Sequence, residues 1–347
     1  MLAVDAREVN TLAQDEKMWR FPPQWKARMK TLQPLSSARV LQPILHHHAF
    51  IMTRLFTFLT ALMFTFPAQA QFSGGLRELI ARRRGSEVPT GKQEMSYGRD
   101  RLQKLDYWRP TAYGAPLVIY IHGGGWKRGS KELASGDKAA HFLQQGYAFA
   151  SLGYRLVPTV HVEDQAQDIS DAVAYLVKNA ETLGFDARRI VLMGHSAGAH
   201  LSALVGTDMR YLKKAGLGSN SLRGVILLDG ACYDVPRQIA EGGDFMLDTY
   251  LQAFGTDPAR QRGLSPFFHA TKPNVASFLI LHVQRADGTA QSRQLGEALR
   301  KAGTSATVKG FEGRGLPGHA EINRRMGDPT YPATPVVDAW LKNTFAL

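Results

Sequence analysis

The residues that could do chemistry begin with a serine held between two glycines. Residues 194–198 read Gly-His-Ser-Ala-Gly, which places Ser196 at the centre of a G-x-S-x-G pattern. This pattern is typical of a nucleophile elbow, a sharp strand-to-helix turn that presents the serine hydroxyl above the edge of a sheet. An apolar run at 190–193 precedes it, and small and apolar residues suited to a helix follow it. This context favours a nucleophile over a flexible loop.

A second glycine-rich stretch could supply hydrogen-bond donors to the same reaction. Residues 122–126 read His-Gly-Gly-Gly-Trp and follow an apolar run at 116–121. Three consecutive glycines are unfavourable in any regular element, so they indicate a loop whose backbone approaches another group closely. The amides of such a loop can bind an oxyanion. A phosphate-binding loop is the weaker interpretation, because neither Gly-x-Gly-x-x-Gly nor a Gly-Lys-Ser/Thr ending is present.

Both motifs must be positioned by strands that alternate with helices. Apolar runs predict strands, and helical spacing predicts helices, in alternating order. The predicted strands are 116–121, 147–152, 190–193, 224–228, 277–283 and 306–311, and the predicted helices are 76–84, 137–145, 164–176, 291–301 and 331–341. This alternation predicts an α/β class protein whose mostly parallel central sheet has helices on both faces. We expect the mixed, charged residues 71–110 to wrap over the domain or to cross the entrance of the site.

The order of the elements resembles the α/β-hydrolase fold. The two glycine motifs are similar to those of the esterase branch that includes hormone-sensitive-lipase-like enzymes and bacterial feruloyl- and acetyl-esterase-like enzymes. The resemblance covers roughly residues 100–345 within a domain expected at 71–347. It implies a carboxylesterase that uses no metal and no organic cofactor and forms an acyl-enzyme on Ser196. The oxyanion donors are then expected to be the amides of Gly124, Gly125 and Ala197.

A serine hydroxyl needs a histidine to take its proton and a carboxylate to orient that histidine. In this fold the acid and then the histidine follow the serine along the chain. The resemblance indicates His319, in a loop predicted at 313–319, as the base. His200 would point along the flank of the elbow helix, and His282 lies inside a predicted buried strand. His269 is the remaining downstream histidine.

The expected acid is Asp287, in the turn after the predicted strand at 277–283. The family usually has a longer turn at this position. Asp229 and Asp234, which follow the strand at 224–228, are the alternatives, because some hydrolases draw the acid from that strand. A helix cap or a surface charge is the ordinary role of any single aspartate.

The first seventy residues do not resemble part of the fold. Residues 52–70 have a charged start, a twelve-residue apolar core at 55–66 and a Pro-Ala-Gln-Ala ending, which predicts a secretory signal peptide cleaved before Gln71. The core is well short of the ~20 residues that cross a bilayer. We expect translation to start at Met52, residues 1–51 to be an upstream extension from a misassigned start, and the protein to be periplasmic or secreted. The alternative is a genuine extension that leaves it in the cytoplasm.

Composition excludes several other function classes. The formal net charge is +12, but no nucleic-acid-binding motif accompanies it, so we expect a small-molecule ester as the partner rather than nucleic acid. The single cysteine, Cys232, rules out an intramolecular disulfide and is expected in the core. His46, His47 and His48 have no carboxylate or cysteine nearby, which argues against a metal site. The sequence leaves the oligomeric state open.

Two other functions compete with the esterase. One is an aryl formamidase or another amidase of the same fold, and the other is a non-catalytic hydrolase fold that serves as a binding module. Within the esterases we expect short acyl chains. The longest insertion, 230–276, carries scattered charges, a Gly-Gly pair and prolines, which argues against an apolar lid.

Overall fold

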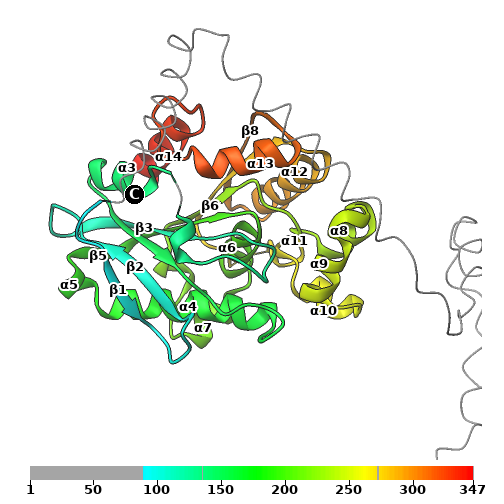
Figure 1. Cartoon of the computed structure of the whole chain (residues 1–347), viewed down its shortest axis with the longest axis horizontal. Helices are drawn as coiled ribbons and strands as arrows, with labels where there is room; N and C mark the ends of the chain where they lie inside the picture. The colour runs from blue at the N-terminus through cyan, green and yellow to red at the C-terminus, as the bar shows by residue number, and fades with distance from the viewer. Residues whose placement is uncertain (1–88, 135, 272, 347) are drawn as a thin grey trace, which may run out of the picture. The chain divides into compact units, whose positions relative to one another are not determined.

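An eight-stranded sheet organises the part of the chain that the structure, a computed structural model, describes: residues 89–134, 136–271 and 273–346. The strands lie in the order β1-β2-β4-β3-β5-β6-β7-β8 (Figure 1). Their bounds are β1 Gln93–Ser96, β2 Lys104–Trp108, β3 Ala115–Ile121, β4 Ala148–Leu152, β5 Phe185–His195, β6 Gly224–Leu228, β7 Ser277–Gln284 and β8 Ser305–Arg314. Strands β3 to β8 pair in parallel, whereas β1 pairs with β2, and β2 with β4, in antiparallel fashion.

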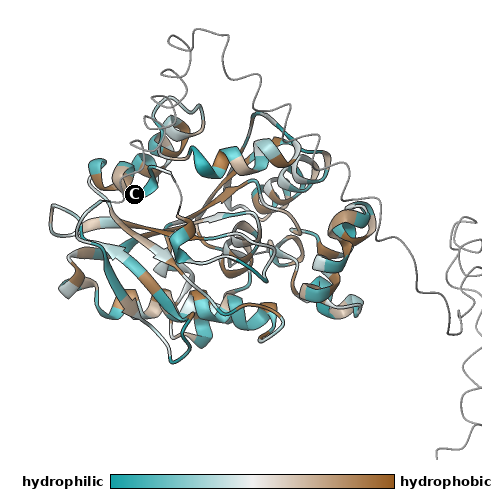
Figure 2. Cartoon of the chain, in the orientation of Figure 1, coloured by the Kyte–Doolittle hydropathy of each residue, from teal (hydrophilic) through white to brown (hydrophobic). Residues whose placement is uncertain are grey.

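The central strands are buried on both faces, which explains their continuous apolar sequences. Every residue of β3 is buried. Leu117 and Ile119 face one core and Val118 and Tyr120 face the other, since successive side chains of a strand point to opposite sides. Figure 2 shows the apolar colour concentrated along these strands.

Helices cover both faces of the sheet. The first core contains residues of α4 (Val162–Lys178), α6 (Ala197–Thr207) and α12 (Ala286–Lys301), and the second contains residues of α3 (Lys138–Gln144), α13 (Gly315–Arg324) and α14 (Thr334–Ala346). The shorter helices are η3 Lys131–Leu133, α5 Ala180–Leu183, α7 Met209–Lys214 and η4 Ser219–Ser221. The expected class and the mostly parallel sheet with helices on both faces are confirmed.

The insertion between β6 and β7 folds into four helices. These are α8 Val235–Glu241, α9 Asp244–Phe254, α10 Pro258–Gly263 and α11 Pro266–His269. Val235, Tyr250, Phe254 and Leu264 bury their side chains in the first core, whereas Phe245 on α9 is 81% exposed. The insertion is therefore anchored to the domain by its larger apolar residues.

Several local predictions need correction. Residues 93–96 and 104–108, expected within a segment that wraps over the domain or crosses the entrance of the site, form β1 and β2 at one end of the sheet, and residues 71–88 lie outside the described part. The predicted loop at 313–319 is the end of β8 followed by α13, so His319 lies on a helix. Helix α12 begins at Ala286, five residues before the predicted start at 291. The other predicted strands and helices within the described ranges are present, with ends that differ by a few residues.

Some predictions fall outside the described residues. These are the helix at 76–84, the signal peptide at 52–70 and the extension at 1–51. Among the described residues, no helix is both long and apolar enough to cross a membrane. Cys232 is fully buried a few residues after the end of β6, as expected for a core residue.

Candidate active site

Ser196 occupies a strained turn between β5 and α6. Its backbone has φ 55° and ψ −119°, a conformation that residues with a side chain rarely adopt. A Cβ at Gly194 would overlap the carbonyl of Gly198, and a Cβ at Gly198 would overlap the carbonyl of Ile121. Both flanking glycines are therefore required by close backbone contacts. The turn is the predicted elbow, with Ser196 at its apex.

The amide of Ala197 is the first helical donor of α6. The first N–H groups of a helix have no acceptor within that helix, and its dipole makes this end positive. Ala197 directly follows the serine, and its backbone N–H can therefore donate a hydrogen bond to an anion bound there. The expected oxyanion role of Ala197 is compatible with this position.

The glycine loop after β3 lies against the elbow. A Cβ built on Gly123 would come within 2.9 Å of the His195 carbonyl oxygen and 3.0 Å of the Ser196 Cβ. Gly124 and Gly125 have φ values of 122° and 61°. Positive φ values of this kind explain the glycines, because a Cβ would strain the backbone there. The structure therefore brings the loop that carries Gly124 and Gly125 to the nucleophile turn.

His319 lies beside the elbow and faces a buried carboxylate. Its Nδ1 is 2.6 Å from Oδ2 of Asp229, and the His319 ring centroid is 4.5 Å from that of His195. Since an ionised carboxylate only accepts, the proton of this bond is on Nδ1 of a neutral His319, and Nε2 is left as the acceptor. This is the tautomer that a general base needs.

Asp229 is held in place from three sides. It follows β6 with φ 46° and is fully buried. Its Oδ1 accepts from the backbone N–H of Val283 at 3.0 Å, and its Oδ2 lies 3.1 Å from Nε of Arg285. Burial alone would raise the pKa of Asp229, but the hydrogen bond with His319 and the charge of Arg285 outweigh it and lower the pKa below its usual value. Asp229 is thus an ionised partner for His319.

The structure corrects the expected acid from Asp287 to Asp229. Asp287 lies in the first turn of α12, and its Oδ2 accepts from Nε2 of Gln238 at 3.1 Å. Because α12 begins directly after β7, the turn that was expected to present Asp287 to the histidine is part of a helix. The other alternative, Asp234, caps α8 through its bond with the N–H of Arg237.

His195 and Arg285 are two contributors that the sequence did not indicate. Nε2 of His195 donates to the backbone carbonyl of His319 at 2.9 Å, so the elbow itself holds the turn of α13 that carries His319. Burial, followed by the repulsion from His319 when that ring is protonated, lowers the pKa of His195 to about 3, which keeps this imidazole neutral. The position between glycine and serine in the G-x-S-x-G pattern is variable by definition, so only the fold reveals this contact.

The other downstream histidines have different partners. Nε2 of His200 contacts the carbonyl of Leu264 at 2.8 Å, and Nε2 of His269 contacts that of Gly263 at 2.8 Å. Nδ1 of His282 lies 3.1 Å from the carbonyl of Val283, and the side chain is buried, as expected for a core residue. His319 is the downstream histidine that meets a carboxylate at the elbow.

In the described ranges, no group of three or more His, Cys, Asp and Glu side chains is arranged to hold a metal.

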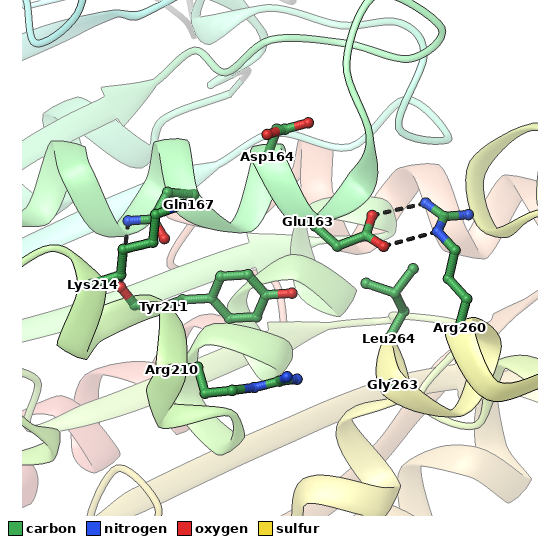
Figure 3. A pocket seen from close by; sticks show the side chains of 9 residues that line it. All are labelled: Glu163, Asp164, Gln167, Arg210, Tyr211, Lys214, Arg260, Gly263 and Leu264. Atoms are coloured by element: carbon green, nitrogen blue, oxygen red, sulfur yellow. Dashed lines mark hydrogen bonds and ion pairs between the residues drawn. The ribbon is translucent and has the colours of Figure 1, made fainter.

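A charged pocket of about 360 Å³ lies between α4, α7 and α10 (Figure 3). Its lining includes Tyr211 and a bidentate ion pair of Arg260 with Glu163 at 2.8 Å, but not Ser196, Asp229 or His319. Since the carboxyl ends of parallel strands are where ligands bind in α/β sheets, the elbow edge remains the candidate active site.

Comparisons with known proteins agree with this geometry. Residues 105–234 match the BD-FAE family model. The esterase LipC of Mycobacterium tuberculosis is 30% identical over 62% of this chain and 56% of LipC, so the chain spans little more than half of that relative's length. The kynurenine formamidase of Danio rerio is 28% identical over 72% of this chain and 82% of that enzyme.

A solved structure supports the fold. The crystal structure of esterase B from Lactobacillus rhamnosis superposes with a TM-score of 0.63 at 22% identity, covering 86% of this chain and 96% of esterase B. Together with the family match, this confirms the resemblance to α/β-hydrolase esterases that the two glycine motifs indicated.

Proposed function

We propose that this chain, which has the α/β-hydrolase fold, is a serine hydrolase that cleaves short-chain carboxylic esters. The observation that carries the proposal is the juxtaposition at one sheet edge of the strained Ser196 elbow and the His319–Asp229 pair, whose Nδ1 to Oδ2 distance is 2.6 Å. This juxtaposition supports Ser196 as the nucleophile, His319 as the base and Asp229 as the orienting acid of an acyl transfer.

The reaction proceeds in two steps. Oγ of Ser196 attacks the ester carbonyl carbon while Nε2 of His319 accepts the hydroxyl proton, and the carbonyl oxygen becomes an oxyanion that the amides of Gly124, Gly125 and Ala197 stabilise. His319 then gives its proton to the departing alcohol, which leaves an acyl-enzyme on Ser196. Water attacks this ester in the same way, and the acid and free Ser196 are released.

Hydrolysis of p-nitrophenyl butyrate by wild type and Ser196→Ala tests the proposal. We expect the variant to fold, because alanine removes a single oxygen, and to lose at least about 10⁴-fold in kcat, since the nucleophile is gone. Equal melting temperatures of the two proteins are the control for folding. Ester hydrolysis that persists in the folded variant would contradict the assignment of Ser196.

A formamidase is the second candidate, favoured by the similarity to the Danio rerio kynurenine formamidase over 82% of that enzyme. The same acyl-transfer machinery would release formate from an aryl formamide, with His319 protonating the departing amine. Comparison of kcat/KM for p-nitrophenyl acetate with that for an aryl formamide such as formanilide distinguishes the two functions. A preference for the formamide would move the assignment from esterase to amidase.

We also propose that residues 52–70 direct export and that the working protein begins at Gln71. Support comes from the charged start, the apolar core and the small residues at the cleavage position in the sequence. Sequencing the N-terminus of the natural protein tests this. Gln71 supports a periplasmic or secreted enzyme, whereas Met1 or Leu2 would contradict it.

A further inference from the structure

The indole of Trp126 and the imidazole of His200 form a hydrogen bond that the mechanism above does not use. Nε1 of Trp126 donates to Nδ1 of His200 at 3.2 Å, and both side chains are buried. Trp126 closes the glycine loop, and His200 lies one turn along α6 from Ser196, whose carbonyl accepts from the His200 N–H at 3.1 Å. The bond therefore joins the segment with the expected oxyanion donors to the segment with the nucleophile.

The protonation of His200 is fixed by its two partners. An indole N–H can only donate, so Nδ1 of His200 must accept from Trp126. A carbonyl can only accept, so Nε2 of His200 carries the proton and donates to Leu264 at 2.8 Å. Burial lowers the pKa of His200 to about 4, which agrees with an imidazole that needs one free lone pair. His200 thus connects the glycine loop, the elbow helix and the insertion.

The glycine loop needs external contacts to keep its shape. Gly124, Gly125 and Trp126 have φ values of 122°, 61° and 61°, and a left-handed conformation costs a residue such as tryptophan roughly 1–2 kcal/mol. The carbonyl of Trp126 accepts from Nε2 of Gln165 at 2.6 Å and from the N–H of Val157 at 3.1 Å. These two bonds hold the backbone of Trp126 at its carbonyl, and its side chain supplies a separate anchor for the loop.

The ring of Trp126 has apolar neighbours on α9. Its centroid lies 4.7 Å from that of Phe254 and 6.2 Å from that of Tyr250, both in edge-to-face arrangements. These contacts fill the space around the indole, but they are less directional than a hydrogen bond and do not fix the orientation of its N–H. The bond to His200 is the directional contact of this side chain.

We propose that His200 is a positioning residue that, through the indole of Trp126, sets the distance and angle of the Gly124 and Gly125 amides relative to Ser196. The inference rests on the proposed function, since it assigns these amides to the oxyanion. Preorganised donors act only when they point at the place where the charge develops, so a small displacement lowers kcat more than it raises KM.

Two amide substitutions separate the two bonds of His200. The Oδ1 of asparagine can occupy the place of Nδ1 and accept from Trp126, whereas the amide of glutamine reaches the place of Nε2 and can donate to Leu264. We expect His200→Asn to keep kcat within about threefold of wild type on p-nitrophenyl butyrate. His200→Gln should lower kcat by about tenfold or more with little change in KM, since small misplacements of a reacting site cost up to about 10²-fold.

Three further measurements distinguish positioning from general stability. Trp126→Phe should lower kcat like His200→Gln, and the double variant should lose no more than either single one, since both remove the same bond. Affinity for a boronic acid that forms a tetrahedral adduct on Ser196 should fall in parallel with kcat. His269→Gln, which replaces another imidazole bonded to a carbonyl of the insertion, is the matched control and should retain kcat.

The kinetics of the His200 variants and of the wild type test the positioning role and the proposed function separately. Equal kcat for His200→Asn and His200→Gln, or a loss confined to the melting temperature, would overturn the positioning role while leaving the hydrolase intact. A wild type that hydrolyses neither ester nor formamide would overturn the proposed function, and the role of His200 with it.

Discussion

At the scale of single residues, the structure shows which aspartate bonds to His319, whereas the spacing of residues in the sequence does not. Ser196 and His319 follow from motif and chain order, and the structure brings both to one edge. Asp229 and Asp287 each follow an apolar strand, so the pattern alone does not separate them. The difference is that Asp229 turns at φ 46° between the ends of β6 and β7, whereas Asp287 is already part of α12.

This assignment predicts different effects of two isosteric changes. Asp229→Asn should lower kcat by about 10⁴-fold, because an amide no longer holds His319 in the required tautomer. Asp287→Asn should stay within about threefold of wild type, since its side chain contacts Gln238 and Arg285 rather than His319. Steady-state kinetics of both variants on p-nitrophenyl butyrate measure this. The reverse order of effects would restore Asp287 as the acid.

At the scale of elements, the apolar strands and the helices around them could be predicted, because burial on both faces leaves a strong signal. β1 and β2 could not, since β1 is an edge strand and both strands are short and carry charged residues such as Glu94 and Lys104. The helices of the insertion were also missed. They are 4 to 11 residues long, and a proline is the first or second residue of three of them, so no periodic pattern has room to develop.

The glycine loop provides a test at this scale. A Cβ at Gly124 would overlap the carbonyl of Arg128, so Gly124→Ala should open the loop and lower kcat by about 10²-fold or more, as loss of an oxyanion donor does. Gly216→Ala is the matched control, because Gly216 also has a positive φ, 79°, with no atom within 4 Å of a built Cβ. The control should lose some stability but keep kcat. Equal kinetics in both variants would contradict the oxyanion role.

The insertion sets the expected acyl length. Tyr250 and Phe254 of α9 pack in the core around Trp126, so these large side chains are not available to line a long channel. Leu316, 57% exposed and three residues before His319 on α13, offers a small apolar surface near the base. Each buried CH₂ favours binding by ~0.8 kcal/mol, and this gain should end after a few carbons.

We therefore expect the highest kcat/KM on acetyl to butyryl esters. A series of p-nitrophenyl esters measured below their solubility limits provides the comparison, with Leu316→Ala expected to reduce the preference for butyryl over acetyl. A rate that rises steadily to chains of twelve carbons or more would show that a long apolar channel exists.

At the scale of the whole molecule, three buried histidines couple folding to pH. Burial lowers the pKa of His122 and His200 to about 4 and that of His195 to about 3. In the unfolded chain each titrates near ~6.5. Between these values the unfolded state binds more protons than the native state, so stability is present above pH ~6.5 and is lost as the pH falls towards 4.

The expected loss is on the order of 2 kcal/mol for each histidine between pH 7 and pH 5, at about 1.4 kcal/mol per pKa unit. Urea unfolding at the two pH values measures it. His200→Asn, which removes one of the three titrations, should reduce the difference by about one third. An unfolding free energy that is the same at pH 7 and pH 5 would show that these imidazoles are protonated in the native state.

The one sulfhydryl of the chain gives access to motions that a static structure does not report. Cys232 is fully buried, has φ 59° and follows the acid-bearing end of β6, and burial raises the pKa of its thiol. A thiol reagent can modify it only while the segment between Asp229 and α8 is open. The rate of labelling would therefore report how often the segment that carries Asp229 opens, with no competing cysteine to remove beforehand.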